Sequence, residues 1–193
     1  VDYRASINYK LNQGLAKNSD FQELMARASV NQSALNNILE FNYNVSYSKT
    51  KASWVDHSAY QQAMKFNPTM PVYTTPDDPN YLKYGGYYQN FDKSGFTNPV
   101  SIIEQPTKDG TDQTFLGSIR ATIKPISGLR LSAFGSYQYW NQSTANYYPS
   151  NSVAGNGNGG SADKANNFNI TRIFEATAQY TNEIQSHAFT VLA

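Results

Sequence analysis

The sequence predicts an all-β fold, namely an antiparallel up-and-down meander of about seven strands that forms part of a large transmembrane β-barrel. Three observations predict it. Apolar and polar residues alternate along most of the 193-residue chain, and the links between the alternating segments are short and long in turn. The apolar faces carry many small residues, whereas the opposite faces consist mainly of Asn, Ser, Thr, Gln and Arg. One side of each strand is therefore expected to contact lipid and the other to face water.

The N-terminal part of the chain contains three alternating segments. Residues 3–11 alternate strictly, residues 21–30 do so less cleanly, and residues 39–48 fit the strand period almost perfectly. The apolar face of the third segment consists of Leu39, Phe41, Tyr43, Val45 and Tyr47. We predict three strands here.

Two further segments, residues 115–124 and 129–140, are expected to pair as a hairpin. The link Ile126-Ser127-Gly128 is short enough for a tight turn. In the second segment the odd positions are apolar or aromatic and the even positions polar, with Phe134 and Trp140 as exceptions. This strand has an apolar face that becomes aromatic toward one end.

The last alternating segments are residues 168–180 and 187–193, joined by a turn at 181–186. Arg172 falls on the apolar side of the first of them. A β-bulge or a guanidinium that reaches out of the apolar layer would explain it.

The connections fall into two classes that alternate along the chain. Short turns are expected at 32–37, 126–128 and 181–186, and longer links at 12–19, 51–110 and 142–166. All longer links then lie at one end of the sheet, which is typical of outer-membrane barrels. Tyrosines near the predicted strand ends fit an aromatic girdle: Tyr9, Tyr47, Tyr137, Tyr139 and Tyr180.

A soluble β-sandwich would show the same strand pattern and stays an alternative. The barrel is favoured because small residues on the apolar faces suit lipid better than a densely filled core. Seven residues are expected to contact lipid: Phe41, Val45, Ile119, Ala121, Leu129, Leu131 and Ala133. Five are expected to face the lumen: Asn42, Asn44, Arg120, Arg130 and Ser132.

Composition and motifs argue against other classes of protein. A net charge of +1 and the lack of a basic cluster give no reason to expect nucleic-acid binding, and no segment approaches the roughly 18 apolar residues of a membrane helix. There is no Cys, and His57 and His187 lack neighbouring ligands, so no metal site is predicted. The "GNGNGG" run at 155–160 lacks the strand-to-helix setting of a dinucleotide motif. We expect neither a cofactor nor an enzyme.

The link at 51–110 is long and carries its own aromatic residues. Residues 56–66 are expected to form a short helix that is capped by Asp56, has Tyr60, Ala63 and Met64 on one face, and ends at Asn67-Pro68. Phe91 and Phe96 lie further along the same link. Long loops with their own aromatics are often functional, although such rings also serve packing. The candidates for contact with a substrate or a partner are Trp54, Tyr73, Tyr81, Tyr84, Tyr87 and Tyr88.

Several runs of residues resemble a known family. They are "YRASINYKLNQGLAKNSDFQEL", then "NQSALN", then "AMKFNPTMPVY" and "TNPV" in the long link. In this order they resemble the early barrel region of SusC/RagA-type TonB-dependent outer-membrane transporters of Bacteroidetes. Such transporters have plugged barrels of roughly 22 strands, so seven strands would be about a third of one. The plug and the TonB box of that family are not expected in residues 1–193.

The resemblance implies a segment of a nutrient importer in the bacterial outer membrane, which takes up glycans or peptides. It also implies a SusD-like surface lipoprotein and the TonB complex as partners, and contact with outer-membrane lipid. A soluble glycan-binding β-domain is the alternative function. An outer-membrane hydrolase would need catalytic residues that the sequence does not show.

Overall fold

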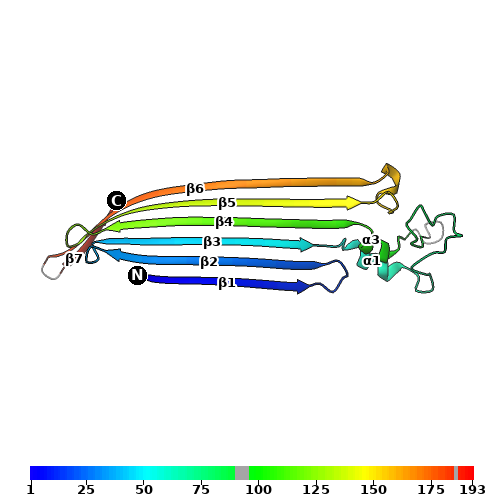
Figure 1. The fold of residues 1–193 in the computed structure, drawn as a ribbon, viewed down its shortest axis with the longest axis horizontal. Coiled ribbons are helices and arrows are strands. Elements are labelled where there is room, and N and C mark those ends of the chain that lie inside the picture. The colour runs from blue at the N-terminus through cyan, green and yellow to red at the C-terminus, as the bar shows by residue number, and fades with distance from the viewer. Residues whose placement is uncertain (90–95, 185–186) are drawn as a thin grey trace.

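The computed structural model describes residues 1–89, 96–184 and 187–193. It contains one antiparallel sheet in which every strand pairs with its neighbours in sequence, in the order β1-β2-β3-β4-β5-β6-β7 (Figure 1). The strands are β1 (Asp2–Gln13), β2 (Asp20–Ala34), β3 (Leu39–Ser53), β4 (Thr107–Ile123), β5 (Leu129–Tyr148), β6 (Ser161–Ile184) and β7 (His187–Leu192). The predicted all-β meander of seven strands is confirmed.

Short elements occupy the links. Helices α1 (Ser58–Lys65) and α3 (Pro99–Glu104) lie between β3 and β4, and the 3-10 helix η1 (Asn156–Asn158) lies between β5 and β6. Among the described residues, no helix has the length and apolarity needed to cross a membrane.

The links separate by length as the sequence predicted. Residues 14–19, 54–106 and 149–160 connect strands at one end of the sheet, and residues 35–38 and 124–128 connect them at the other (Figure 1). The turn expected at 181–186 was placed too early, because residues 181–184 belong to β6 and pair with β7. Residues 185 and 186 lie outside the described residues.

The tight turn before β5 requires a glycine. Gly128 has φ of +83°, and a Cβ there would lie 2.2 Å from the carbonyl oxygen of Thr181. The amide of Thr181 in β6 donates to the carbonyl of Gly128 at 2.9 Å. An L side chain at position 128 would therefore both strain the turn and push it away from β6.

The strands next to the long links run further than the sequence predicted. The link expected at 142–166 is confined to 149–160, and the one expected at 51–110 is confined to 54–106. The alternation stops at Tyr139 because the next residues on that face, Asn141 and Ser143, are polar. Backbone pairing does not need an apolar face, so β5 continues to Tyr148.

The apolar face forms a band of limited height. On β5 it runs from Leu129 to Tyr139, about 33 Å along the strand at roughly 3.3 Å per residue. A strand tilt of about 40° would reduce this to a band about 25 Å tall, which matches the apolar band of outer-membrane barrels. Many of its side chains are exposed, such as Ile7 at 79% and Phe174 at 78%. No other part of the described chain covers them.

Three residues that broke the alternation have partners in the sheet. Arg172 needs no bulge, because the β5–β6 register is continuous there, and its guanidinium lies 5.8 Å from the ring centre of Tyr137. The second residue is Phe134 on the polar face, whose ring centre lies 4.7 Å from the guanidinium of Arg120. The third residue, Trp140, donates to a carboxylate described below. Cation–π contact thus explains the first two.

The packed core of the described residues lies in the long link rather than in the sheet. The buried apolar residues are Val55, Ala59 and Tyr84, all between β3 and β4. The predicted helix is present as α1, which buries Ala59, while Tyr60 and Met64 on the predicted face are 49% and 80% exposed. The packing direction depends on contacts between α1 and α3, which helical spacing alone does not fix.

Candidate functional site

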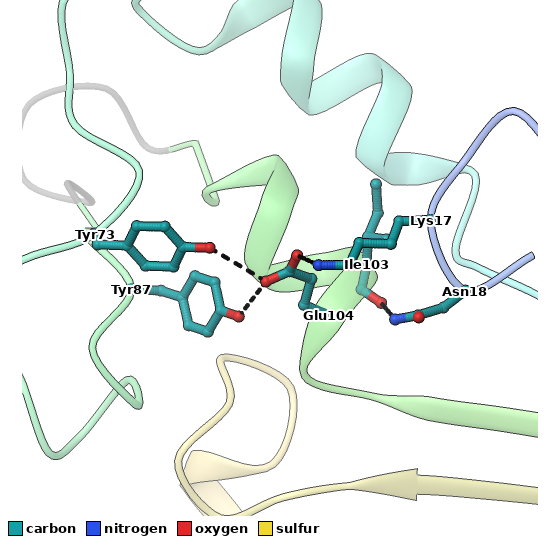
Figure 2. Close-up of polar contacts among 6 residues, drawn as sticks. All are labelled: Lys17, Asn18, Tyr73, Tyr87, Ile103 and Glu104. Atoms are coloured by element: carbon teal, nitrogen blue, oxygen red, sulfur yellow. Dashed lines mark hydrogen bonds and ion pairs between the residues drawn. The ribbon is translucent and has the colours of Figure 1, made fainter.

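Glu104, the last residue of α3, is the centre of a polar cluster between two links (Figure 2). Its carboxylate accepts hydrogen bonds from the hydroxyls of Tyr87 at 2.6 Å and Tyr73 at 3.4 Å, and pairs with the ammonium of Lys17 at 2.5 Å. Lys17 belongs to the β1–β2 link, and the amide of its neighbour Asn18 donates to the carbonyl of Ile103 at 3.3 Å. These contacts attach the β1–β2 link to the long link.

The cluster shifts the pKa of its members in opposite directions. The hydrogen bond from Lys17, followed by that from Tyr87, holds the pKa of Glu104 below its ordinary value. Burial, followed by the bond to Glu104, raises the pKa of Tyr87. The tyrosine thus stays a neutral donor to an ionised acceptor, which makes this a charge-assisted hydrogen bond.

The residue that follows α3 contacts the β5–β6 link. The side-chain amide of Gln105 donates to the carbonyl oxygens of Tyr84 at 3.1 Å and Asn151 at 2.7 Å. The three residues Ile103, Glu104 and Gln105 therefore join all three links at this end of the sheet. We call them the α3 junction.

Asn98 organises the interior of the long link. It is fully buried, and its side-chain oxygen accepts from the amide of Val100, which caps α3. Its side-chain nitrogen donates to the carbonyls of Val72 at 2.7 Å and Tyr88 at 3.1 Å. One amide side chain thus fixes the start of α3 and two distant backbone segments.

The start of the long link is held against the sheet by charge. Asp56 accepts from the backbone amide of Ser58 at 3.0 Å and from the ammonium of Lys108 at 3.1 Å. The bond from the Ser58 amide is the main reason that the pKa of Asp56 falls from 3.8 to about 2. Asp56 supports α1 in this way, although the N-cap position itself is His57.

The predicted contact residues differ in accessibility. Tyr73 and Trp54 are 58% and 39% exposed, whereas Tyr84 is buried at 9%. Tyr81, Tyr87 and Tyr88 are partly buried. Phe91, which the sequence placed in the same aromatic set, lies outside the described residues.

The polar face holds an aromatic residue that sequence reasoning did not select. The indole nitrogen of Trp140 in β5 donates to the carboxylate of Asp112 in β4 at 2.9 Å. A tryptophan on the polar side of an otherwise regular strand was the available signal. Its acidic partner depends on the β4–β5 register, which the sequence does not reveal. Among the described residues, no three His, Asp or Glu side chains are arranged to hold a metal ion.

Comparisons with known proteins place this architecture among bacterial receptors. No protein-family profile matches the chain. It is 27% identical over 164 residues to the TonB-dependent receptor SusC of Bacteroides thetaiotaomicron, covering 75% of this chain and 16% of that protein. It is 25% identical over 204 residues to the TonB-dependent receptor P26 of Formosa agariphila, covering 100% of this chain and 19% of that protein.

A solved structure shares the fold. The structure of the RagAB peptide importer in the "open-open" state superposes with a TM-score of 0.70 at 21% identity, covering 98% of this chain and 21% of that chain. The chain thus spans about a fifth or less of the length of the proteins that it matches. The sequence likeness, the seven-stranded meander and the shared fold agree, and the chain is similar to a segment of the SusC/RagA-type TonB-dependent receptors.

Proposed function

We propose that this chain forms part of the wall of a bacterial outer-membrane importer that takes up glycans or peptides. The observation that best supports this proposal is the exposed apolar band of the sheet, because its height of about 25 Å equals that of the apolar band of outer-membrane barrels. The proteins that it matches are named as receptors and as an importer. TonB-dependent receptors are outer-membrane proteins, which supports the same location for this chain.

In this proposal the two faces of the sheet have different surroundings. The apolar face, with Leu129, Leu131 and Ala133 on β5, contacts lipid. The polar face, with Arg120 and Asn42, lines the lumen. Burial of the apolar face in lipid also explains why it needs no covering layer of protein.

The links joined by the α3 junction then lie at the extracellular rim, because outer-membrane barrels keep their long loops outside. Residues 54–106 would contact the substrate or a SusD-like surface lipoprotein. Tyr73 and Trp54 are the best placed of the candidate residues because their rings remain exposed. Tyr84, Tyr87 and Tyr88 would act mainly by holding the loop in shape. Energy for import would come from the TonB complex.

Cysteine labelling of the full-length protein in intact cells tests the orientation. Leu82 is 83% exposed in the long link, and Ser127 is exposed in the turn at the opposite end. A membrane-impermeant maleimide is expected to label a Leu82→Cys variant and to leave the matched Ser127→Cys variant unlabelled until cells are broken. Labelling of only the Ser127→Cys variant in intact cells would reverse the proposed orientation.

Growth of a deletion strain tests the import function. The strain is expected to lose growth on some member of a panel of single purified glycans and peptide digests, and to regain it with the full-length gene. Disruption of TonB should abolish the same growth. Undiminished growth of the deletion strain on the whole panel would contradict an import role.

A further inference from the structure

The polar face carries two indole rings near the rim, beyond the end of the apolar band. Trp140 projects from β5, where it lies opposite Thr114 of β4. Trp54 follows the last residue of β3, and its backbone amide donates to the carbonyl of Lys108 at 3.0 Å. Both rings come from positions that the strand backbones fix.

The ring of Trp54 lies directly against β4 because position 110 is a glycine. A Cβ on Gly110 would lie 2.4 Å from Cη2 and 2.7 Å from Cζ3 of that ring. Position 110 is on the same face as Asp112 and Thr114, since alternate residues of a strand share a face. Trp54 therefore lies on the polar face too, with 39% of its surface exposed.

The carboxylate of Asp112 fixes the second ring. It accepts from the indole nitrogen of Trp140 at 2.9 Å, which leaves its other oxygen able to accept further hydrogen bonds. Gln142 lies opposite Asp112 in the register, and Thr144 lies opposite Gly110. A carboxylate, an amide and a hydroxyl thus lie between the two rings.

The spacing of the rings suits an elongated ligand. Gly110 lies against the Trp54 ring and Thr114 lies opposite the backbone of Trp140, and these two positions are about 13 Å apart at roughly 3.3 Å per residue. Flat aromatic faces carry partial negative charge and attract the C–H groups of sugar rings. Carboxylate and amide side chains form hydrogen bonds with sugar hydroxyls, which both donate and accept. A peptide strand would instead need unpaired backbone groups, and β4 and β5 are each paired on both sides.

We propose that Trp54, Asp112, Trp140 and Gln142 form a saccharide-binding subsite on the lumen wall, near its extracellular rim. This subsite rests on the proposed function, and it selects glycans rather than peptides as the ligand class. Trp54 and Trp140 stack on separate sugar rings of one oligosaccharide. Asp112 and Gln142 bind hydroxyls between them.

The test uses the purified full-length receptor with an array of neutral oligosaccharides and a tryptic digest of casein. The best-bound oligosaccharide is then titrated by calorimetry. Trp54→Ala and Trp140→Ala are each expected to weaken its binding about 3- to 10-fold, as for the loss of one aromatic contact. The double variant should weaken it by roughly the product. Tyr139→Leu, on the opposite face of the same strand, is the matched control and should bind normally.

A milder pair of variants covers the case in which a tryptophan variant misfolds. Gly110→Ala should turn the Trp54 ring away and weaken binding as Trp54→Ala does. Gly117→Ala should leave binding unchanged, because a Cβ there meets only ordinary contacts at 3.5 Å.

Three results would overturn the subsite. They are unchanged oligosaccharide affinity in the tryptophan and Gly110→Ala variants, binding of casein peptides that depends on the same rings, and no binding to any oligosaccharide on the array. Loss of growth of the deletion strain on peptide digests alone would also reject the glycan assignment, yet it would leave the import function standing. Failure of the import function would instead appear as undiminished growth on the whole panel.

Discussion

Replacement of Asn98 by alanine should open the long link locally while leaving the sheet intact. The variant loses the cap of α3, which is worth about 1 kcal/mol. It also loses two buried hydrogen bonds, to Val72 and Tyr88, at about 1 kcal/mol each. The local free energy of opening should fall by about 3 kcal/mol, and amide exchange should accelerate roughly 100-fold, since 1.4 kcal/mol is a factor of ten.

Hydrogen exchange of the full-length receptor, followed by mass spectrometry, measures this effect at the amides of Tyr88 and Val100. Asn67→Ala is the matched control in the same link. Asn67 is exposed and its oxygen accepts from the amide of Thr69 at 3.0 Å, so its loss should change exchange at Tyr88 less than about 5-fold. Exchange at Tyr88 in the Asn98→Ala variant within about 3-fold of wild type would refute the reasoning.

Three further predictions concern charge and facing. Glu104→Gln should speed exchange in the β1–β2 link by freeing Lys17; unchanged exchange there would contradict the pairing. The lowered pKa of Asp56 stabilises α1 above pH 3.8, and this is lost as the pH falls toward about 2. Pepsin should then cut α1 of the wild type faster at about pH 2 than at pH 4. The Asp56→Asn variant should not show this difference. Spin labels at 129–134 should show lipid contact only at odd positions; equal accessibility would disprove the facing.

The contribution of Asp56 is modest. The drop in pKa from 3.8 to about 2 would correspond to about 2.5 kcal/mol for a group shielded from solvent. The carboxylate is 43% exposed, so solvent screening reduces this to about 1 kcal/mol.

The strands were predictable because their signal is local. Alternation within residues 39–48 or 129–140 reports which face is apolar, and the short links then force the order of pairing. Strand ends were less predictable, since the face of β5 that carries Tyr139 becomes polar at Asn141 and Ser143 and the sequence there resembles a loop. Pairing with β4 and β6 keeps it extended.

The candidate site depended on contacts that no local pattern contains. Helix α3 has only six residues, too few for a visible period, and its role comes from Lys17 and Asn151, which are far away in sequence. The aromatic residues of the long link were recognisable as a set. Which of them is buried, as Tyr84 is, and which is exposed, as Tyr73 is, follows from the fold of the link.

The α3 junction limits how this receptor can be re-engineered. Residues 14–19 and 149–160 each bond to the α3 junction, which belongs to the 54–106 link. A chimaera that receives only the long link from a relative would place foreign side chains opposite Lys17 and Asn151. Grafts that transfer the three links as one cassette should retain the junction, and those that transfer one alone should lose it.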